Sequence, residues 1–222
     1  DVVAEIGSNH NGCWETVLKM LDQVSAVKAD AVKFQYYRAE KLYPENTYVA
    51  DYLIGSGGIE KGTRIVDLLK KAEIPEEWLD DLVIQCELRN IDLIISAFDV
   101  ESVEVLVRHG IKRLKVASSE ITHYPLLSAV GETGLPVILS TGMSNLGMIE
   151  NALKKIGHNN VVLLHCTAAY PVPDTEVNLR VIQTLRHAFG LPVGLSDHTK
   201  GILAAGIAFA LGAVMIEKHF TL

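Results

Sequence analysis

A (β/α)8 barrel is the fold that this sequence predicts. Short apolar runs, rich in β-branched residues and leucine, recur along the chain, and helical stretches separate them. Polar or ionisable residues follow each apolar run, as they do at the carboxyl ends of barrel strands. The chain has 222 residues, 49% of them hydrophobic, which is enough for the core of one such domain.

Eight apolar runs are expected to be strands. They are Val2–Ile6, Ala31–Phe34, Ile91–Ile95, Arg113–Ala117, Pro136–Leu139, Val161–Leu164, Pro192–Leu195 and Ala213–Ile216. Because such runs alternate with helices, they predict a parallel sheet that is covered by helices. Eight of these units close into a barrel, and an open doubly wound sheet is the alternative.

Helical stretches follow the first seven runs. The first, Trp14–Val27, carries apolar residues at helical spacing. The others are Thr63–Lys71, Glu76–Arg89, Val100–His109, Pro125–Glu132, Leu146–Ile156, Asn178–Phe189 and Gly201–Leu211. A polar insertion reaches from the second run to about Gly62, and its Gly-rich stretch at 54–58 predicts a loop over the catalytic face.

No helical stretch follows the eighth run. We therefore expect a barrel that is truncated after strand eight, with the final helix not covered by this sequence. Residues 1–222 are interpreted as a single catalytic domain.

Composition narrows the function classes. The net charge of −7 argues against nucleic-acid binding, which usually requires a basic surface. No apolar run approaches the roughly 20 residues of a membrane span. Cys13, Cys86 and Cys166 are odd in number and widely spaced, so they predict no disulfide framework and a cytoplasmic location.

Polar side chains at the ends of the expected strands form the candidate site. Each has a structural explanation on its own, as a helix cap, a turn residue or a solvated lysine. Their recurrence on all eight strands predicts an active site at one end of the barrel. The residues are Glu5, Asn9, Lys33, Gln35, Ser96, Lys115, Ser118, Glu120, Ser140, Ser196, His198 and His219.

Lys33 and Lys115 each lie inside an apolar run, where an unpaired ammonium group is unfavourable. An anion between them would remove that cost. Pairing with a barrel carboxylate such as Glu5 or Glu217 is one alternative, and a Schiff-base lysine is another. Neutral donors suited to phosphate or carboxylate oxygens are nearby at Ser118, Ser140 and Ser196.

His198 and His219 end neighbouring strands, so their rings are expected to meet over the barrel. Two imidazoles with open positions fit a divalent metal ion that polarises a carbonyl group. The alternative is two hydrogen-bonded histidines, one of them an acid or base. His165 is a further candidate for the barrel mouth, whereas Cys166 points to the opposite face and is interpreted as a small buried hydrophobe.

Seven motifs, taken in order, resemble the N-acetylneuraminate synthase family nearly from end to end. They are AEIGSNHNG (Ala4–Gly12), ADAVKFQ (Ala29–Gln35), KVASSE (Lys115–Glu120), LSTGM (Leu139–Met143), LLHCTAAYPVP (Leu163–Pro173), GLSDHT (Gly194–Thr199) and IEKHFTL (Ile216–Leu222). The resemblance implies condensation of phosphoenolpyruvate with an N-acylated hexosamine, such as N-acetylmannosamine or its 6-phosphate. The product is a sialic-acid-type sugar acid, and phosphate leaves by C–O cleavage.

The resemblance also implies residue roles. His198 and His219 would ligate Mn2+ or Mg2+, and Glu5, Lys33, Lys115 and His219 would be catalytic. Phosphoenolpyruvate would be held by Lys33, Lys115, Ser118, Ser140 and Ser196. Ser96 is also expected to bind substrate, but the motif at the end of strand three departs from the family at Ala97. Contacts to the sugar, or to the water and metal around it, would come from Glu5, Asn9, Gln35, Glu120 and Tyr170.

Family members commonly continue into an antifreeze-like domain and form homodimers, so both are expected of the full-length protein. The expected partners are phosphoenolpyruvate and an aminosugar, without nucleic acid or membrane. Two other functions stay open: a barrel aldolase that works through a lysine Schiff base on a pyruvate-derived sugar acid, and a non-catalytic sugar-binding barrel.

Overall fold

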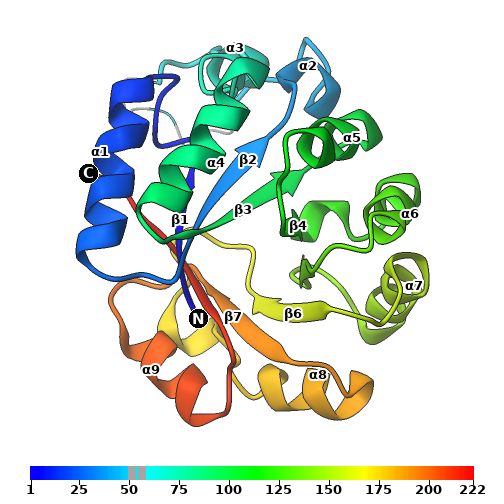
Figure 1. Ribbon diagram of the computed structural model, residues 1–222. Coiled ribbons are helices and arrows are strands. Elements are labelled where there is room, and N and C mark those ends of the chain that lie inside the picture. The colour runs from blue at the N-terminus through cyan, green and yellow to red at the C-terminus, as the bar shows by residue number, and fades with distance from the viewer. Residues whose placement is uncertain (50–53, 55–58) are drawn as a thin grey trace.

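Eight parallel strands close into a barrel in chain order in the computed structural model, which describes residues 1–49, 54 and 59–222 (Figure 1). β1 pairs with β2 on one side and with β8 on the other. That closure confirms the (β/α)8 prediction and excludes the open sheet. The strands are β1 Val2–Gly7, β2 Ala31–Tyr36, β3 Asp92–Ala97, β4 Leu114–Val116, β5 Val137–Ser140, β6 Val161–Cys166, β7 Val193–Asp197 and β8 Ile216–His219.

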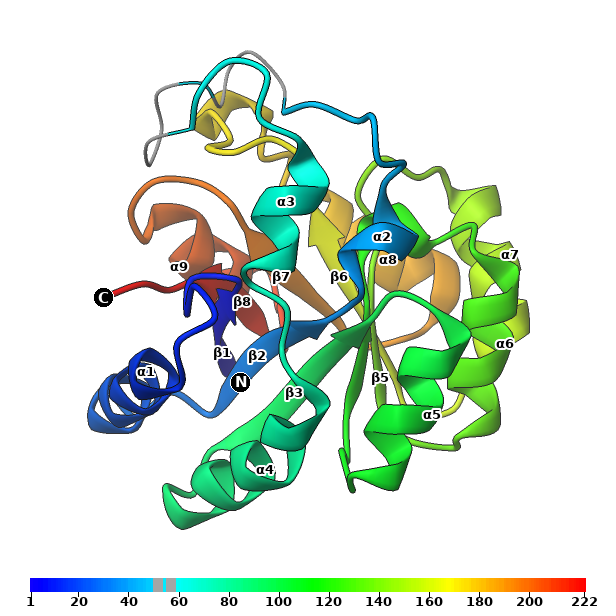
Figure 2. The same cartoon turned by 90° about the horizontal axis from the view of Figure 1, so that it is seen from above.

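Helices surround the barrel as an outer layer, except for the two short helices of the segment after β2, which lie at the carboxyl ends of the strands (Figures 1 and 2). They are α1 Trp14–Ala26, α2 Ala39–Leu42, α3 Ile65–Lys70, α4 Leu79–Leu88, α5 Val100–Arg108, α6 Tyr124–Glu132, α7 Leu146–Ile156, α8 Val181–Phe189 and α9 Leu203–Ala210. Polar caps fix some of their starts: Asp99 Oδ1 accepts from Ser102 N, and Asn145 Oδ1 accepts from Met148 N. None of the helices that the structure describes is long and apolar enough to cross a bilayer.

The eighth strand was predicted three residues too early. Ala213 lies in the turn after α9, where its backbone N–H donates to the carbonyl of Ala208, and β8 runs from Ile216 to His219. The polar insertion contains the short helix α2, which was not predicted and which lies beside α3 at the end of β2 (Figure 2). Residues 55–58 of the Gly-rich stretch lie outside the described residues.

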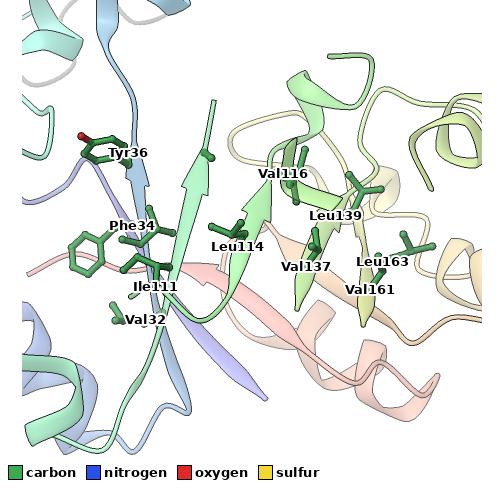
Figure 3. Close-up of a cluster of buried hydrophobic side chains, with 14 of the residues drawn as sticks. Val32, Phe34, Tyr36, Ile111, Leu114, Val116, Val137, Leu139, Val161 and Leu163 are labelled. Carbon is green, nitrogen blue, oxygen red and sulfur yellow. The ribbon is translucent and has the colours of Figure 1, made fainter. Parts of the chain in front are cut away.

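Side chains of each strand alternate between the helices and the barrel interior. Figure 3 shows outward-facing residues such as Val32, Leu114 and Val137 in the core beneath the helices. The inward-facing apolar residues fill the interior at one level: Val3, Ala31, Ile94, Ile138, Leu164 and Met215. Two positions further along the same strands, the inward residues are polar: Glu5, Lys33, Ser96, Ser140, Cys166 and Glu217. An apolar plug therefore supports a polar layer at the carboxyl ends of the strands.

Candidate active site

A cavity of about 450 Å³ lies above the polar layer, and it contains most of the predicted site residues. Aromatic and apolar side chains from the segments after β2, β3 and β5 form its outer wall, including Tyr37, Tyr43, Phe98 and Met143. The predicted residues that line it are Glu5, Lys33, Gln35, Lys115, Ser118, Ser140, Tyr170, Ser196, His198 and His219. The structure thus brings together groups that are more than 200 positions apart in the sequence.

Two lysines and two glutamates alternate across the floor of this cavity. Lys33 Nζ lies 2.9 Å from Glu5 Oε2 and 3.8 Å from Glu217 Oε1. Lys115 Nζ lies 3.3 and 3.2 Å from the two carboxylate oxygens of Glu217. Both ammonium groups therefore reach one carboxylate, and the pairing that the sequence left open as an alternative is present.

Burial sets the protonation of this cluster. It acts to raise the pKa of Glu217, but the ammonium groups of Lys115 and Lys33 outweigh it and hold that pKa at about 2. Burial raises the pKa of Glu5, which its ion pair with Lys33 only partly offsets. The pKa of Lys115 is lowered by burial and by the nearby Lys33 charge, despite Glu217. Glu217 is thus firmly ionised, while Glu5 holds a proton more readily than an exposed glutamate.

The serine hydroxyls beside the lysines have room for a ligand. Ser140 Oγ is buried and has no hydrogen-bond partner among the residues that the structure describes. Ser118 Oγ accepts a hydrogen bond from Gly142 N at 3.0 Å, and its own proton can be donated, either to the neighbouring Cys166 thiol or to a ligand. A side chain at position 142 would bring its Cβ to 2.9 Å from Ser118 Oγ, so glycine allows this close approach. Such a set of neutral donors next to two ammonium groups suits an anion.

His198 and His219 face each other at the rim, with their ring centroids 5.5 Å apart. His198 Nδ1 lies 2.9 Å from the carbonyl oxygen of Thr167, so this nitrogen carries the proton and Nε2 presents a lone pair. Burial lowers the pKa of His198. Burial, His198 and Lys33 lower that of His219 to about 4, although the exposure of this residue to solvent weakens the effect. Both rings are therefore neutral at pH 7.

The spacing of the two histidine rings is compatible with a shared metal ion. Metal–nitrogen bonds of about 2.1 Å place the centroids of two rings on one ion roughly 4.5–6.5 Å apart, and these two fall within that range. Neutral imidazoles are the form that ligates metals. Among the described residues, no group of three His, Cys, Asp or Glu side chains is arranged to hold an ion. The pair therefore fits a metal site that is completed by groups other than these side chains.

Three predicted residues do not line the cavity. Asn9 donates through Nδ2 to the carbonyl oxygen of Phe220 at 2.8 Å and so ties the β1–α1 loop to the end of β8. Ser96 lies buried behind Lys33, at 3.4 Å from its Nζ. Glu120 turns towards His123, with its Oε2 3.1 Å from Nδ1. Contacts of these residues with a substrate stay predictions.

Glu217 and Cys166 line the cavity but were not predicted as site residues. Glu217 had a sequence signal, since it directly follows the eighth apolar run and lies two positions before His219. Cys166 was assigned to the opposite face, which is wrong: its Sγ lies 3.9 Å from His198 Nδ1. His165 instead points outwards, where its Nε2 contacts the carbonyl oxygen of Val177 at 2.6 Å.

Glu217 predicts a specific pH dependence of stability. Its folded pKa of about 2 is below the ordinary value of 4.5, so its contribution is complete above pH 4.5 and is lost as the pH falls towards 2. The expected contribution at neutral pH is about 3 kcal/mol. Urea unfolding of the wild type and of Glu217→Gln, measured from pH 3 to pH 7, tests this. The difference in unfolding free energy should shrink as the pH falls, and a constant difference would contradict the assignment.

The sequence matches one family model and is similar to proteins of other organisms over its whole length. A model of the NeuB family matches residues 20–222. N,N'-diacetyllegionaminic acid synthase of Campylobacter jejuni is 39% identical over the whole chain, which covers 67% of that protein. An uncharacterized protein of Methanocaldococcus jannaschii is 40% identical over the whole chain, which covers 62% of it. The chain thus spans about two thirds of the length of these relatives.

The fold also matches a solved structure closely. The crystal structure of N-acetylneuraminic acid (sialic acid) synthetase from Leptospira borgpetersenii, in complex with citrate, superposes with a TM-score of 0.88. The two sequences are 36% identical, and the match covers 99% of this chain and 72% of the other.

Proposed function

The chain belongs to the NeuB family, and from this premise we propose that it condenses phosphoenolpyruvate with an N-acylated hexosamine. The sugar is N-acetylmannosamine-like or its 6-phosphate, and the product is a nine-carbon 2-keto sugar acid. The enol carbon of phosphoenolpyruvate bonds to the aldehyde carbon, water adds to the resulting oxocarbenium-like centre, and phosphate leaves as the C–O bond breaks. The observation that carries the proposal is one cavity with two buried ammonium groups beside two neutral imidazoles.

The lysine end of the cavity suits the enol phosphate. Lys33 and Lys115 supply fixed positive charge in a site shielded from water, where such charge acts most strongly on a developing negative charge. Ser118 and Ser140 add neutral donors for phosphate or carboxylate oxygens. Because burial raises the pKa of Glu5, this carboxyl takes up a proton readily and releases Lys33 for the ligand.

The histidine end suits the aldehyde. His198 and His219 would hold Mn2+ or Mg2+, which supplies Lewis-acid polarisation of a carbonyl group when it is bound. Gln35 and Tyr170 line the wall nearby and would orient the sugar. Gln35 also donates to Glu5 Oε1 at 3.2 Å, so it holds the Glu5 carboxyl in place. The location in the cytoplasm and assembly as a homodimer belong to the same proposal.

The direct test is phosphate release by the purified protein. Phosphate should appear only when phosphoenolpyruvate, an aminosugar and a divalent metal ion are all present, and a panel of N-acylated hexosamines with and without a 6-phosphate identifies the sugar. Phosphoenolpyruvate with 18O at the bridging oxygen should transfer the label to phosphate, because the C–O bond breaks. Absence of phosphate release with every sugar, or label retained in the organic product, would refute the proposed reaction.

One observation favours a second candidate, a Schiff-base aldolase. The lowered pKa of Lys115 increases the fraction of neutral amine, which such an enzyme needs. Borohydride treatment in the presence of pyruvate separates the two functions. The synthase predicts no covalent adduct at Lys115, because both lysines act as fixed charges; an adduct at Lys115 would favour the aldolase.

A further inference from the structure

A second ion pair lies directly behind the two histidines. Asp197 of β7 and Lys218 of β8 are register partners on adjacent strands. The residues on either side of Asp197, Ser196 and His198, line the cavity. So do the residues on either side of Lys218, Glu217 and His219. Since side chains alternate along a strand, Asp197 and Lys218 project away from the cavity.

This ion pair encloses the backbone of His198. Lys218 Nζ donates to Asp197 Oδ2 and to the carbonyl oxygen of Thr199, both at 2.8 Å. Asp197 Oδ1 accepts from Thr199 N at 2.8 Å and from Thr199 Oγ1 at 2.7 Å. The residues before and after His198 are therefore tied to each other and to the residue that precedes His219.

Stability alone does not account for such a pair. The Asp197 side chain is 0% exposed and that of Lys218 is 30% exposed, so removing the pair from water carries a large desolvation cost. Well-packed apolar side chains often stabilise a fold as well as a buried ion pair does, or better. What an ion pair with four directed hydrogen bonds adds is a fixed relative position of β7 and β8.

We propose that Asp197 and Lys218 are positioning residues that set the separation of His198 and His219 for a shared divalent cation. The inference rests on the proposed function, because it concerns the metal site of that reaction. Other contacts orient the ring of His198 itself: its Nδ1 bonds to the carbonyl oxygen of Thr167, and Tyr170 stacks on it with centroids 4.1 Å apart. The ion pair instead fixes the position of the two strands that carry the rings.

The test measures Mn2+ affinity by the loss of the free-ion electron paramagnetic resonance signal. Lys218→Met and Asp197→Asn should each weaken Mn2+ binding about tenfold, as loss of groups that orient metal ligands usually does. The double variant should bind no more weakly than the weaker single variant, because the pair acts as one unit. Lys218→Arg, which keeps the charge, should restore most of the affinity.

An ion pair that also joins neighbouring strands, but with an exposed carboxylate at the opposite end of the barrel, is the control. Arg113 NH2 lies 3.1 Å from Asp92 Oδ2 and joins the starts of β3 and β4, far from the histidines along both strands. Asp92→Asn should leave Mn2+ affinity unchanged. Melting temperatures recorded for every variant separate loss of folding from loss of metal, and if Asp197→Asn does not fold, the two variants at the partly exposed Lys218 carry the test.

Two outcomes must be kept apart. If the wild type binds Mn2+ and His198→Ala abolishes that binding, but folded Lys218→Met binds as tightly as the wild type, the positioning role is overturned while the proposed metal site stands. If the wild type itself binds no Mn2+, or binds it equally well without His198, the metal site of the proposed function fails and this inference fails with it.

Discussion

Replacing Lys115 by methionine should lower kcat/KM for phosphoenolpyruvate by roughly a thousandfold, chiefly through KM. The substitution removes a cation next to the anion site and leaves Glu217 with the more distant ammonium group of Lys33, 3.8 Å away, and the hydroxyl of Ser196. Truncating one partner of a buried charge pair at a binding site costs about 2–5 kcal/mol of binding free energy, and each 1.4 kcal/mol or so is a tenfold change in affinity. Steady-state kinetics with phosphoenolpyruvate varied at saturating sugar and metal measure the effect.

Lys112 provides the matched control for this experiment. It lies three positions before Lys115, its side chain is 80% exposed, and its ion pair with Glu87 is on the surface. Exposed pairs of this kind contribute about 0–1 kcal/mol, so Lys112→Met should leave the kinetics unchanged. Equal kinetic losses in the two variants would mean that Lys115 acts through general stability and not through the anion.

The His198→Ala variant should lose retained Mn2+ and have a kcat lower by roughly a thousandfold. A bound cation contributes several kcal/mol of charge stabilisation to a carbonyl reaction, and about 4 kcal/mol corresponds to that factor. Metal content after gel filtration and kcat at saturating phosphoenolpyruvate are the two measurements. His187, an exposed histidine at the end of α8, is the control, and His187→Ala should keep both the metal and the rate.

Unchanged metal content in His198→Ala would remove the ligand assignment even if activity were lost. A fall in kcat with the metal retained would instead assign His198 to acid–base chemistry, which the sequence left open as the alternative for this pair. The two measurements together therefore separate the two interpretations.

Alternation within the strands made the centre of the site predictable. In the motif AVKF, Val32 and Phe34 are apolar residues that the helices cover, so Lys33 between them faces the barrel interior. The same argument places Lys115 between Leu114 and Val116. The two lysines lie on β2 and β4, with only β3 between them, so their meeting follows from the barrel order.

Cys166 and His165 were misplaced because their strand gives no such signal. The run Val161–Leu164 is apolar at every position, since strands buried on both faces need no alternation. Nothing in that run fixes which of the next two residues faces inwards. The structure settles it through pairing, where Cys166 is the register partner of Ser196.

The contacts of Asn9 and Glu120 could not be predicted for a different reason. Both residues lie beyond the ends of strands, where the course of the chain is set by local turns and not by the sheet. Their hydrogen bonds, to the carbonyl oxygen of Phe220 and to His123, depend on these turns. Glu217 was named from the sequence as one possible partner of the lysines, but its place between both of them depends on β8, which was predicted three residues too early.

Anomalous X-ray scattering from crystals of the protein grown with Mn2+ and phosphoenolpyruvate addresses the active-site assignment most directly. We expect one manganese peak between the rings of His198 and His219, and density for the enol phosphate in contact with Lys33 and Lys115. A manganese peak elsewhere, or phosphoenolpyruvate bound away from both lysines, would contradict it.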